Sequence, residues 1–194
     1  AKLYERAQSQ FYFNQNENVM LYQARAQYEN GNLEEARKIL RKALMIAPWN
    51  HRIRFNLAYV IQEVAQRTLN RTMKSTSSDG RLAQVESAIE DLTLAHKLFE
   101  QLQALGNQAE FGFDAKRTSV HASFCKQALA KSKPHLEAAQ KEEASILAAK
   151  NAQLTARRAA EDHDDGSSAS RRRGVRGVES PQEAAERGLA LIHI

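Results

Sequence analysis

Residues 19–50 read VMLYQARAQYENGNLEEARKILRKALMIAPWN, and this stretch decides the fold class. Gly31, between two asparagines, suits the positive φ angle at which one helix ends and a turn begins. The stretch is therefore predicted to form two helices. Asn32 is placed to cap the second helix, with Glu35 three residues later, as in a capping box. That helix repeats apolar residues at helical spacing on one face, before Pro48 closes the unit: Ala36, Leu40, Ala43 and Leu44.

A helical hairpin of about 34 residues with small, apolar, glycine and proline residues at these positions is typical of a tetratricopeptide repeat. Small residues stand where the two helices of such a hairpin cross, because short side chains allow close approach; here they are Ala24, Ala36 and Ala43. Gln23 and Gln27 depart from the pattern, which prefers large apolar residues at their positions. They lie four residues apart and share one helix face. Two interpretations stay open: they line a groove or a seam with a partner, or they hydrogen-bond a neighbouring turn.

The next repeat, from about His51, is interrupted. Its first helix carries Leu57, Ala58 and Ile61 at the expected positions, but a polar, turn-rich loop follows at residues 75–80. The second helix resumes near Leu82 with a small-large-small pattern at Ala88, Leu92 and Ala95. The sequence thus predicts a longer first helix and an inserted loop, and inserted loops on repeat proteins often mark a binding face.

A third helix pair is predicted after a stop at Gly106-Asn107. One helix spans about residues 109–131, Ser132-Lys133-Pro134 breaks or restarts the chain, and a long helix follows to about Glu161. The long helix is rich in alanine with few large apolar residues, so we expect it to leave the repeats and project. The apolar residues of the helix at 109–131 are Phe111, Phe113, Val120, Phe124, Cys125 and Leu129.

These features predict an all-α chain, a tetratricopeptide solenoid followed by a long projecting helix and a disordered tail. Its predicted parts are repeats at 1–132, the extended helix at 133–161 and a tail at 162–194 with a short helix at 181–191. At the start of the chain, Leu3, Tyr4 and Ala7 resemble the second half of a preceding repeat. Phe11, Tyr12 and Phe13 are then expected to cover the start of the Val19 helix.

Composition and charge exclude several classes of protein. Hydrophobic residues make up 42% of the 194 residues, and no run approaches the 18 apolar residues of a membrane span. A single cysteine, Cys125, excludes an internal disulfide framework and a cysteine-based zinc site. The net charge of +5 is concentrated at residues 51–81. We favour a solvated helix face, because no aromatic residues interleave with the charges as a nucleic-acid site would require. The alternative, which stays open, is a face that meets an acidic partner or nucleic acid.

The sequence shows no strong catalytic, cofactor or metal motif. Its six histidines have no histidine four residues away and no carboxylate at metal-binding spacing, and its glycines form no phosphate loop. His121 and Cys125 lie four residues apart, which allows a nucleophilic pair. A buried structural pair is the favoured interpretation, since cysteine is among the most buried residue types. We therefore expect no enzyme activity, no cofactor and no bound metal.

Three stretches carry a more specific resemblance: NVMLYQARAQYENGNLEEARKILRKALMIAPWN, RFNLAYVIQEVAQRTL and VESAIEDLTLAHKLFEQLQALG. They look like the tetratricopeptide subunit of the RNA polymerase II-associated factor (Paf) complex, over about residues 2–160. The resemblance implies a nuclear scaffold that holds other Paf subunits, including the parafibromin-like one, and supports transcription elongation and histone modification. It also implies that the extended helix bridges toward RNA polymerase II. From the composition and the charge pattern we expect no membrane contact and no direct nucleic-acid binding.

The alternative from the repeat pattern alone is a generic tetratricopeptide adaptor that binds a peptide or helix of another protein. A clamp for a peptide carboxylate needs lysine and asparagine on the first helices, and glutamines at 23 and 27 argue against it. On either interpretation, the candidate protein-binding residues are Gln23, Gln27, Arg52, Arg54, Tyr59, Arg67 and Phe99.

Overall fold

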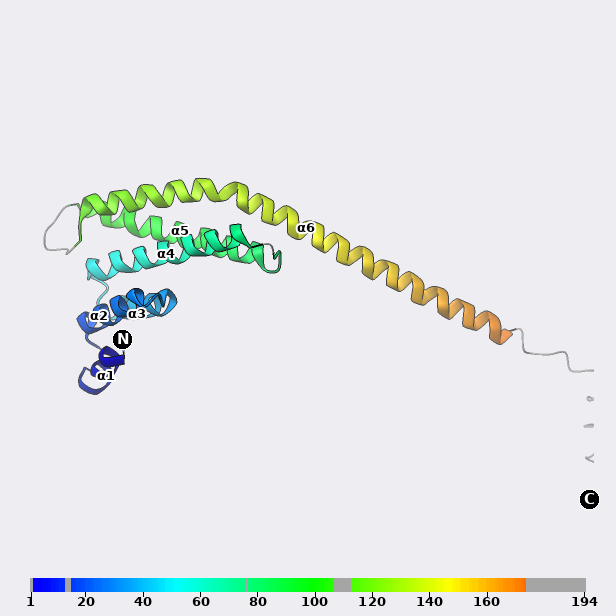
Figure 1. The fold of residues 1–194 in the computed structure, drawn as a ribbon, viewed down its shortest axis with the longest axis horizontal. Coiled ribbons are helices and arrows are strands. Elements are labelled where there is room, and N and C mark those ends of the chain that lie inside the picture. The colour runs from blue at the N-terminus through cyan, green and yellow to red at the C-terminus, as the bar shows by residue number, and fades with distance from the viewer. Residues whose placement is uncertain (1, 13–14, 76, 107–112, 174–194) are drawn as a thin grey trace, which may run out of the picture. The chain divides into compact units, whose positions relative to one another are not determined.

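A computed structural model describes residues 2–12, 15–75, 77–106 and 113–173 of the chain, with side chains up to residue 159. The chain divides into two compact units, at residues 1–144 and 145–194. The described residues contain six helices and no strand (Figure 1), which confirms the predicted all-α class. The helices are α1 (Lys2–Phe11), α2 (Glu17–Glu29), α3 (Leu33–Ile46), α4 (His51–Lys74), α5 (Arg81–Ala104) and α6 (Ala115–Arg173).

The hairpin of α2 and α3 has the predicted turn but not the predicted cap. Gly31 has a φ angle of 80°, the left-handed conformation that glycine adopts without a Cβ penalty. Asn32 makes no side-chain cap bond, so the predicted capping box with Glu35 is wrong. Its amide instead donates to Gln27 Oε1 at 3.0 Å, which ties the turn to the end of α2.

Alanines occupy the helix crossings of the first unit, as the repeat pattern predicts. Ala36, Ala43, Ala58 and Ala95 are completely buried, and Ala88 is 2% exposed. Short side chains let the helices approach closely, and larger ones fill the space between the crossings. The large buried residues of this core include Leu40, Ile53, Ile61, Leu92, Phe99 and Leu102.

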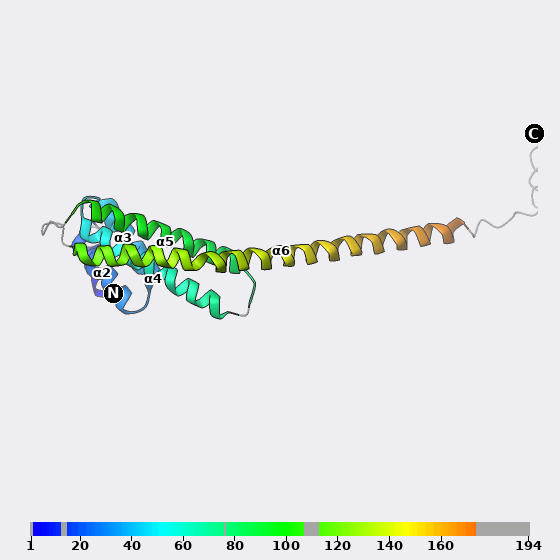
Figure 2. The same cartoon turned by 90° about the horizontal axis from the view of Figure 1, so that it is seen from above.

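Neighbouring helices pack in chain order: α1 against α2, α2 against α3, α3 against α4, and α4 against α5. The loop between α4 and α5 lies where the sequence predicts it, with Gly80 at a φ angle of 64° before α5. Figures 1 and 2 both show the first part of α6 beside α4 and α5. Ala122 and Cys125 of α6 belong to the same core cluster as the residues of α4 and α5.

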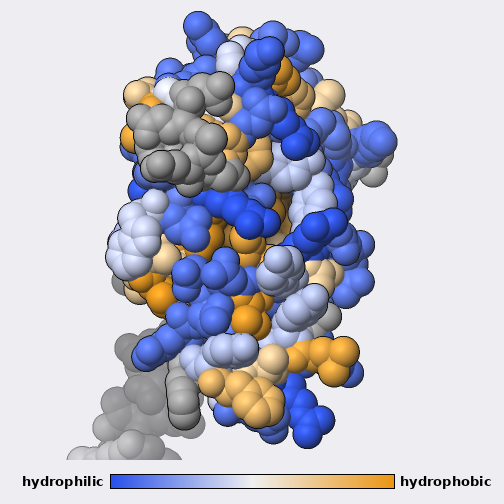
Figure 3. All heavy atoms as spheres, turned by 90° about the vertical axis from the view of Figure 1, so that its left-hand side faces the viewer, coloured by the Kyte–Doolittle hydropathy of each residue, from blue (hydrophilic) through white to orange (hydrophobic). Residues whose placement is uncertain are grey.

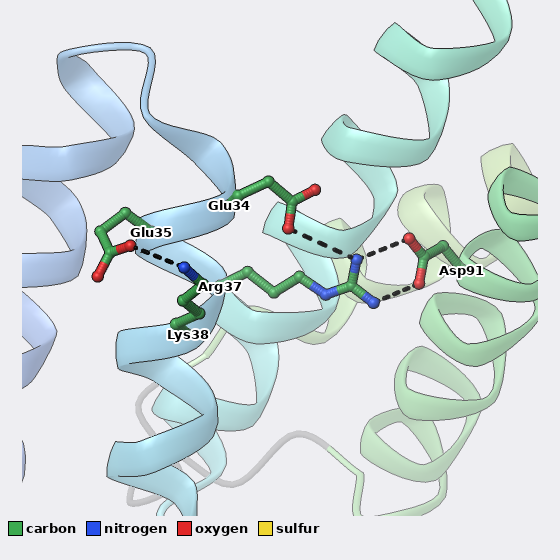
Figure 4. Close-up of polar contacts among 5 residues, drawn as sticks. All are labelled: Glu34, Glu35, Arg37, Lys38 and Asp91. Atoms are coloured by element: carbon green, nitrogen blue, oxygen red, sulfur yellow. Dashed lines mark hydrogen bonds and ion pairs between the residues drawn. The ribbon is translucent and has the colours of Figure 1, made fainter. Parts of the chain in front are cut away.

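An ion pair joins the two hairpins across the solenoid (Figure 4). The guanidinium of Arg37 on α3 donates two hydrogen bonds to the carboxylate of Asp91 on α5, one of them at 2.7 Å. The two side chains are only 14% and 12% exposed. Because α3 and α5 are the second helices of successive hairpins, this pair fixes one repeat against the next.

Helix α6 differs from the prediction at its start, middle and end. It begins at Ala115, where Asp114 Oδ1 accepts from Lys116 N at 2.8 Å. Pro134 lies inside the helix, so the predicted break at 132–134 is wrong. The helix continues to Arg173 rather than ending near Glu161, so residues 162–173 of the predicted tail are helical. The short helix predicted at 181–191 lies outside the described residues.

In the second unit, α6 provides residues 145–173. Its described side chains up to Ala159 are exposed except for Ile146, which is partly buried, and Leu147 and Leu154 are 58% and 50% exposed. This agrees with a thin apolar stripe, while the projection of the helix and the division of the chain at 132 stay predictions. Among the described residues, no helix is long and apolar enough to cross a membrane.

The aromatic residues near the N-terminus do not act as predicted. Phe11 and Tyr12 are 73% and 43% exposed, so they do not cover the start of α2. Tyr4 of α1 instead stacks on Tyr22 of α2, with ring centroids 6.2 Å apart. Phe13 lies outside the described residues.

Candidate protein-binding groove

A hollow of about 500 Å³ opens between α2, the first half of α4 and the start of α6. Figure 3 views the end of the molecule at which α4 and α6 begin, where apolar side chains show between hydrophilic ones. α2 and α4 are the first helices of the two hairpins, and α6 follows the second hairpin in the same position. The lining residues are Leu21, Tyr22, Ala24, Arg25, Tyr28, Glu29, Leu40, Arg52, Phe55, Asn56, Tyr59, Val60, Phe113, Asp114 and Arg117.

Aromatic side chains form much of the wall of this hollow. Tyr28 Oη donates to Tyr59 Oη at 3.3 Å, and the two rings are 5.8 Å apart. That hydrogen bond, together with burial, raises the pKa of Tyr28 to about 12, so the phenol of Tyr28 is neutral near neutral pH. Phe55 stacks on Phe113 with centroids 6.5 Å apart. Aromatic rings with a polar tip provide large contact area and a directional bond, which suits a protein-binding surface.

Some charged side chains that line the groove have a partner, and others have no ion-pair partner among the described residues. Arg25 Nε pairs with Glu29 Oε1 at 2.8 Å on the exposed surface of α2. The carboxylate of Asp114 accepts the backbone N–H groups of Lys116 and Arg117, which caps α6. Among the described residues, no ion pair joins the guanidinium groups of Arg52 and Arg117 to a carboxylate. The hollow therefore has positive charge available to a ligand.

A buried polar cluster holds α6 against α4 beneath the groove. Gln62 of α4, only 4% exposed, places its Oε1 3.1 Å from His121 Nδ1 and 3.6 Å from Cys125 Sγ. The ring of His121 also stacks on Phe99, with centroids 5.3 Å apart. His121 and Cys125 thus share one buried acceptor.

The protonation of this cluster opposes nucleophilic chemistry. Burial raises the pKa of the Cys125 thiol to about 11, which keeps it protonated near neutral pH. Burial, and then the charge of Arg117, lower the pKa of His121. An activated cysteine needs a lowered pKa beside a charged histidine. This geometry therefore supports the structural interpretation of His121 and Cys125.

Two of the seven predicted residues lie in the groove. Arg52 is exposed and Tyr59 is partly buried, and both line the hollow between α2, α4 and α6. Arg54 instead donates from Nη2 to the carbonyl of Pro48 at 2.8 Å, which supports the turn before α4. Phe99 is fully buried, so the structure places it in the core rather than on a binding surface.

The other three predicted residues lie elsewhere on the first unit. Gln27 and Arg67 line a separate hollow beside the α2–α3 turn, and Gln23 lines another with residues of α1 and α3. The bond between Gln27 and Asn32 supports the interpretation in which this glutamine bonds a neighbouring turn. Gln23 and Gln27 therefore do not form one groove with Arg52 and Tyr59.

Sequence reasoning missed most of the aromatic wall and two of the three arginines that line the groove, Arg25 and Arg117. Tyr22 and Tyr28 lie on α2, Phe113 precedes α6, and Arg117 lies in its first turn. The tyrosines could have been predicted from their position. Aromatic residues on the first helices of successive repeats can face a common groove. No comparable signal pointed to Phe113 and Arg117, because the predicted helix began at about residue 109 and the start of α6 was misplaced.

In the part of the chain that the structure describes, no group of three or more His, Cys, Asp or Glu side chains could hold a metal ion. The groove offers aromatic rings, an asparagine and arginines, which bind by contact area and charge.

Comparison with known proteins gives both a repeat family and longer relatives. Residues 17–60 match the tetratricopeptide repeat family. The chain is 32% identical over 142 residues to a protein named CTR9 homolog from Arabidopsis thaliana. It is 31% identical over 143 residues to the RNA polymerase-associated protein CTR9 of Caenorhabditis elegans. These alignments cover 73% and 72% of this chain but only 12% of each relative.

Proposed function

We propose that the chain, a homologue of one segment of the CTR9 proteins, is a protein-binding scaffold of an assembly like the Paf complex. The resemblance of its sequence to the tetratricopeptide subunit of that complex points to the same role. The groove between α2, α4 and α6 is the surface proposed to hold a partner. The observation that carries the proposal is the aromatic wall of this groove, which the exposed cations Arg52 of α4 and Arg117 of α6 also line. We propose no catalytic role.

The finer roles follow from the homology and belong to the same proposal. The chain works in the nucleus, where it holds other Paf subunits, including the parafibromin-like one. Through them it supports transcription elongation and histone modification. The stretch of α6 beyond residue 144 is the part proposed to bridge toward RNA polymerase II, because its described side chains up to Ala159 are exposed apart from Ile146.

Co-purification tests this proposal. The tagged 194-residue chain is incubated with nuclear extract, and the other Paf subunits are measured in the eluate. We expect them to be enriched over the tag alone. A matched variant, Tyr22→Ala with Arg52→Ala, should retain less of them because it removes exposed groove side chains without opening the core. If the wild-type chain retains no Paf subunit, the scaffold proposal fails.

A further inference from the structure

A second hollow lies farther along the same two helices. It measures about 320 Å³ and opens between the second half of α4 and α6, with Leu92 of α5 among its lining residues. Leu69, Met73, Phe124 and Ala128 give it a mainly apolar wall. Met73 is 51% exposed, so this apolar surface is open to solvent at its edge. The hollow has the size and character of a site for one large aliphatic or aromatic side chain.

Both hollows lie along one seam between α4 and α6. On α6, the lining residues of the two sites recur at spacings of three, four and seven, which places them on one helix face. On α4, the first site is lined around Asn56 and the second around Asn70. At 1.5 Å per residue, their centres are about 20 Å apart along α4. One bound segment can therefore reach both sites.

The seam carries a positive excess. Arg52, Arg117 and Lys131 line the two hollows as exposed cations, and none of them has an ion-pair partner among the described side chains. The lining acids are already engaged, since Glu29 pairs with Arg25 and Asp114 caps α6. Glu63, on α4 between the two hollows, is partly buried and adds a negative charge that reduces this positive excess.

We propose that this seam, from Arg52 to Met73 on α4 and from Arg117 to His135 on α6, binds an acidic segment of a partner protein. Such a segment places acidic side chains against Arg52 and Arg117. About 20 Å farther along it inserts an apolar anchor beside Met73, with another acid near Lys131. Charge complementarity selects an acidic segment over a basic one. This inference rests on the proposed scaffold function and names the chemistry of its partner.

The test uses the full 194-residue chain with purified subunits of a Paf assembly. A photo-crosslinking amino acid replaces Tyr22 or Met73, which are 49% and 51% exposed and therefore tolerate a new side chain. Mass spectrometry identifies the cross-linked partner segment. We expect a segment with net negative charge, and an apolar residue at the Met73 cross-link.

Charge reversal gives the second measurement. The variant R52E/R117E/K131E should weaken binding by at least about tenfold, because attraction is replaced by like-charge repulsion. The matched control R41E/K42E/K141E reverses three exposed charges that line neither hollow and lie outside the seam, and it should leave binding unchanged. Circular dichroism confirms that both variants fold.

The outcomes separate the two proposals. If the wild-type chain retains no subunit, the scaffold function fails and the acidic-segment proposal falls with it. If subunits are retained but the cross-linked segments are neutral or basic, or come from neither position, only the acidic-segment proposal is overturned. Equal binding by the charge-reversed variant and its control overturns it as well.

Discussion

Breaking the ion pair between Arg37 and Asp91 should destabilise the solenoid far more than breaking an exposed pair on its surface. It joins the second helices of successive hairpins and is nearly enclosed, with side chains 14% and 12% exposed. The informative perturbations are Arg37→Met, Asp91→Leu and the double variant. Each single change leaves one charge enclosed without its partner, whereas the double change removes both charges and keeps apolar volume.

The magnitude follows from burial. Removing one partner of a buried pair costs about 3–5 kcal/mol, because the remaining charge is left desolvated. Residual exposure lets some water reach the charge, and Glu34 lies 4.0 Å from Arg37, so the lower end of that range applies. Each single variant should therefore lose about 3 kcal/mol of unfolding free energy. The double variant should lose about 1 kcal/mol, since apolar replacements of buried pairs are often nearly neutral.

Urea unfolding followed by circular dichroism measures these values. With an m-value of about 2 kcal/mol/M, a loss of 3 kcal/mol lowers the urea midpoint by about 1.5 M. Lys38→Met is the matched control on the same helix. Its pair with Glu35 is 3.2 Å long, but the side chains are 72% and 50% exposed. The control should change the unfolding free energy by less than about 0.5 kcal/mol.

Two results would refute this reasoning. Single variants that lose no more than the Lys38→Met control would mean that an unpaired charge at this site costs no more than one on the surface. A double variant that loses the sum of the single losses would mean that the two charges do not stabilise each other, because independent sites are additive.

Three further predictions concern the turn, the buried histidine and the cysteine. Gly31→Ala should cost about 1–2 kcal/mol in urea unfolding, because a Cβ is disfavoured at a φ angle of 80°; Gly31→Asn should cost less, and equal losses would contradict this. Burial lowers the pKa of His121. Below about pH 6.5 the unfolded state therefore binds more protons than the folded state, and the free energy of unfolding should fall as the pH drops further. His121→Gln should flatten the dependence of Tm on pH between 7.5 and 5.5, and an unchanged slope would contradict the assignment. Burial raises the pKa of Cys125 to about 11, so at pH 8 maleimide labelling of the native chain should be about two orders of magnitude slower than in urea; similar rates would show that the thiol is accessible and ionised.

The repeat architecture was readable from sequence because it depends on local signals. Ala36 and Ala43 lie seven residues apart on the same face of one helix, and Gly31 marks the turn. Each of these signals acts within one hairpin. The interrupted repeat was readable for the same reason, since the polar loop at 75–80 separates two long apolar patterns. Such features need no knowledge of which helices meet in space.

The groove was only partly predictable because its residues come from helices far apart in the sequence. Tyr28 and Tyr59 meet across successive first helices, and Phe113 joins them from a third segment. Phe99 was predicted to be a protein-binding residue, and it lies in one of the three stretches that carry the resemblance. It is buried because α6 covers α5, with His121 stacked on its ring. Whether a residue is exposed depends on which other helices pack over it. The sequence pattern of a single helix does not show which helices those are.

Helix α6 shows how packing overrides a local break. Pro134 has no N–H to donate to the carbonyl of Ala130, and its ring disfavours helical backbone before it. Sequence alone therefore favours a stop. However, Ser132 and Ala139 on either side are only 2% and 3% exposed, and Arg81 of α5 pairs with Glu142 at 3.3 Å. A break at 134 would turn residues 135–142 away from these contacts. Loss of one backbone hydrogen bond costs less than loss of that packing, so the helix continues through the proline.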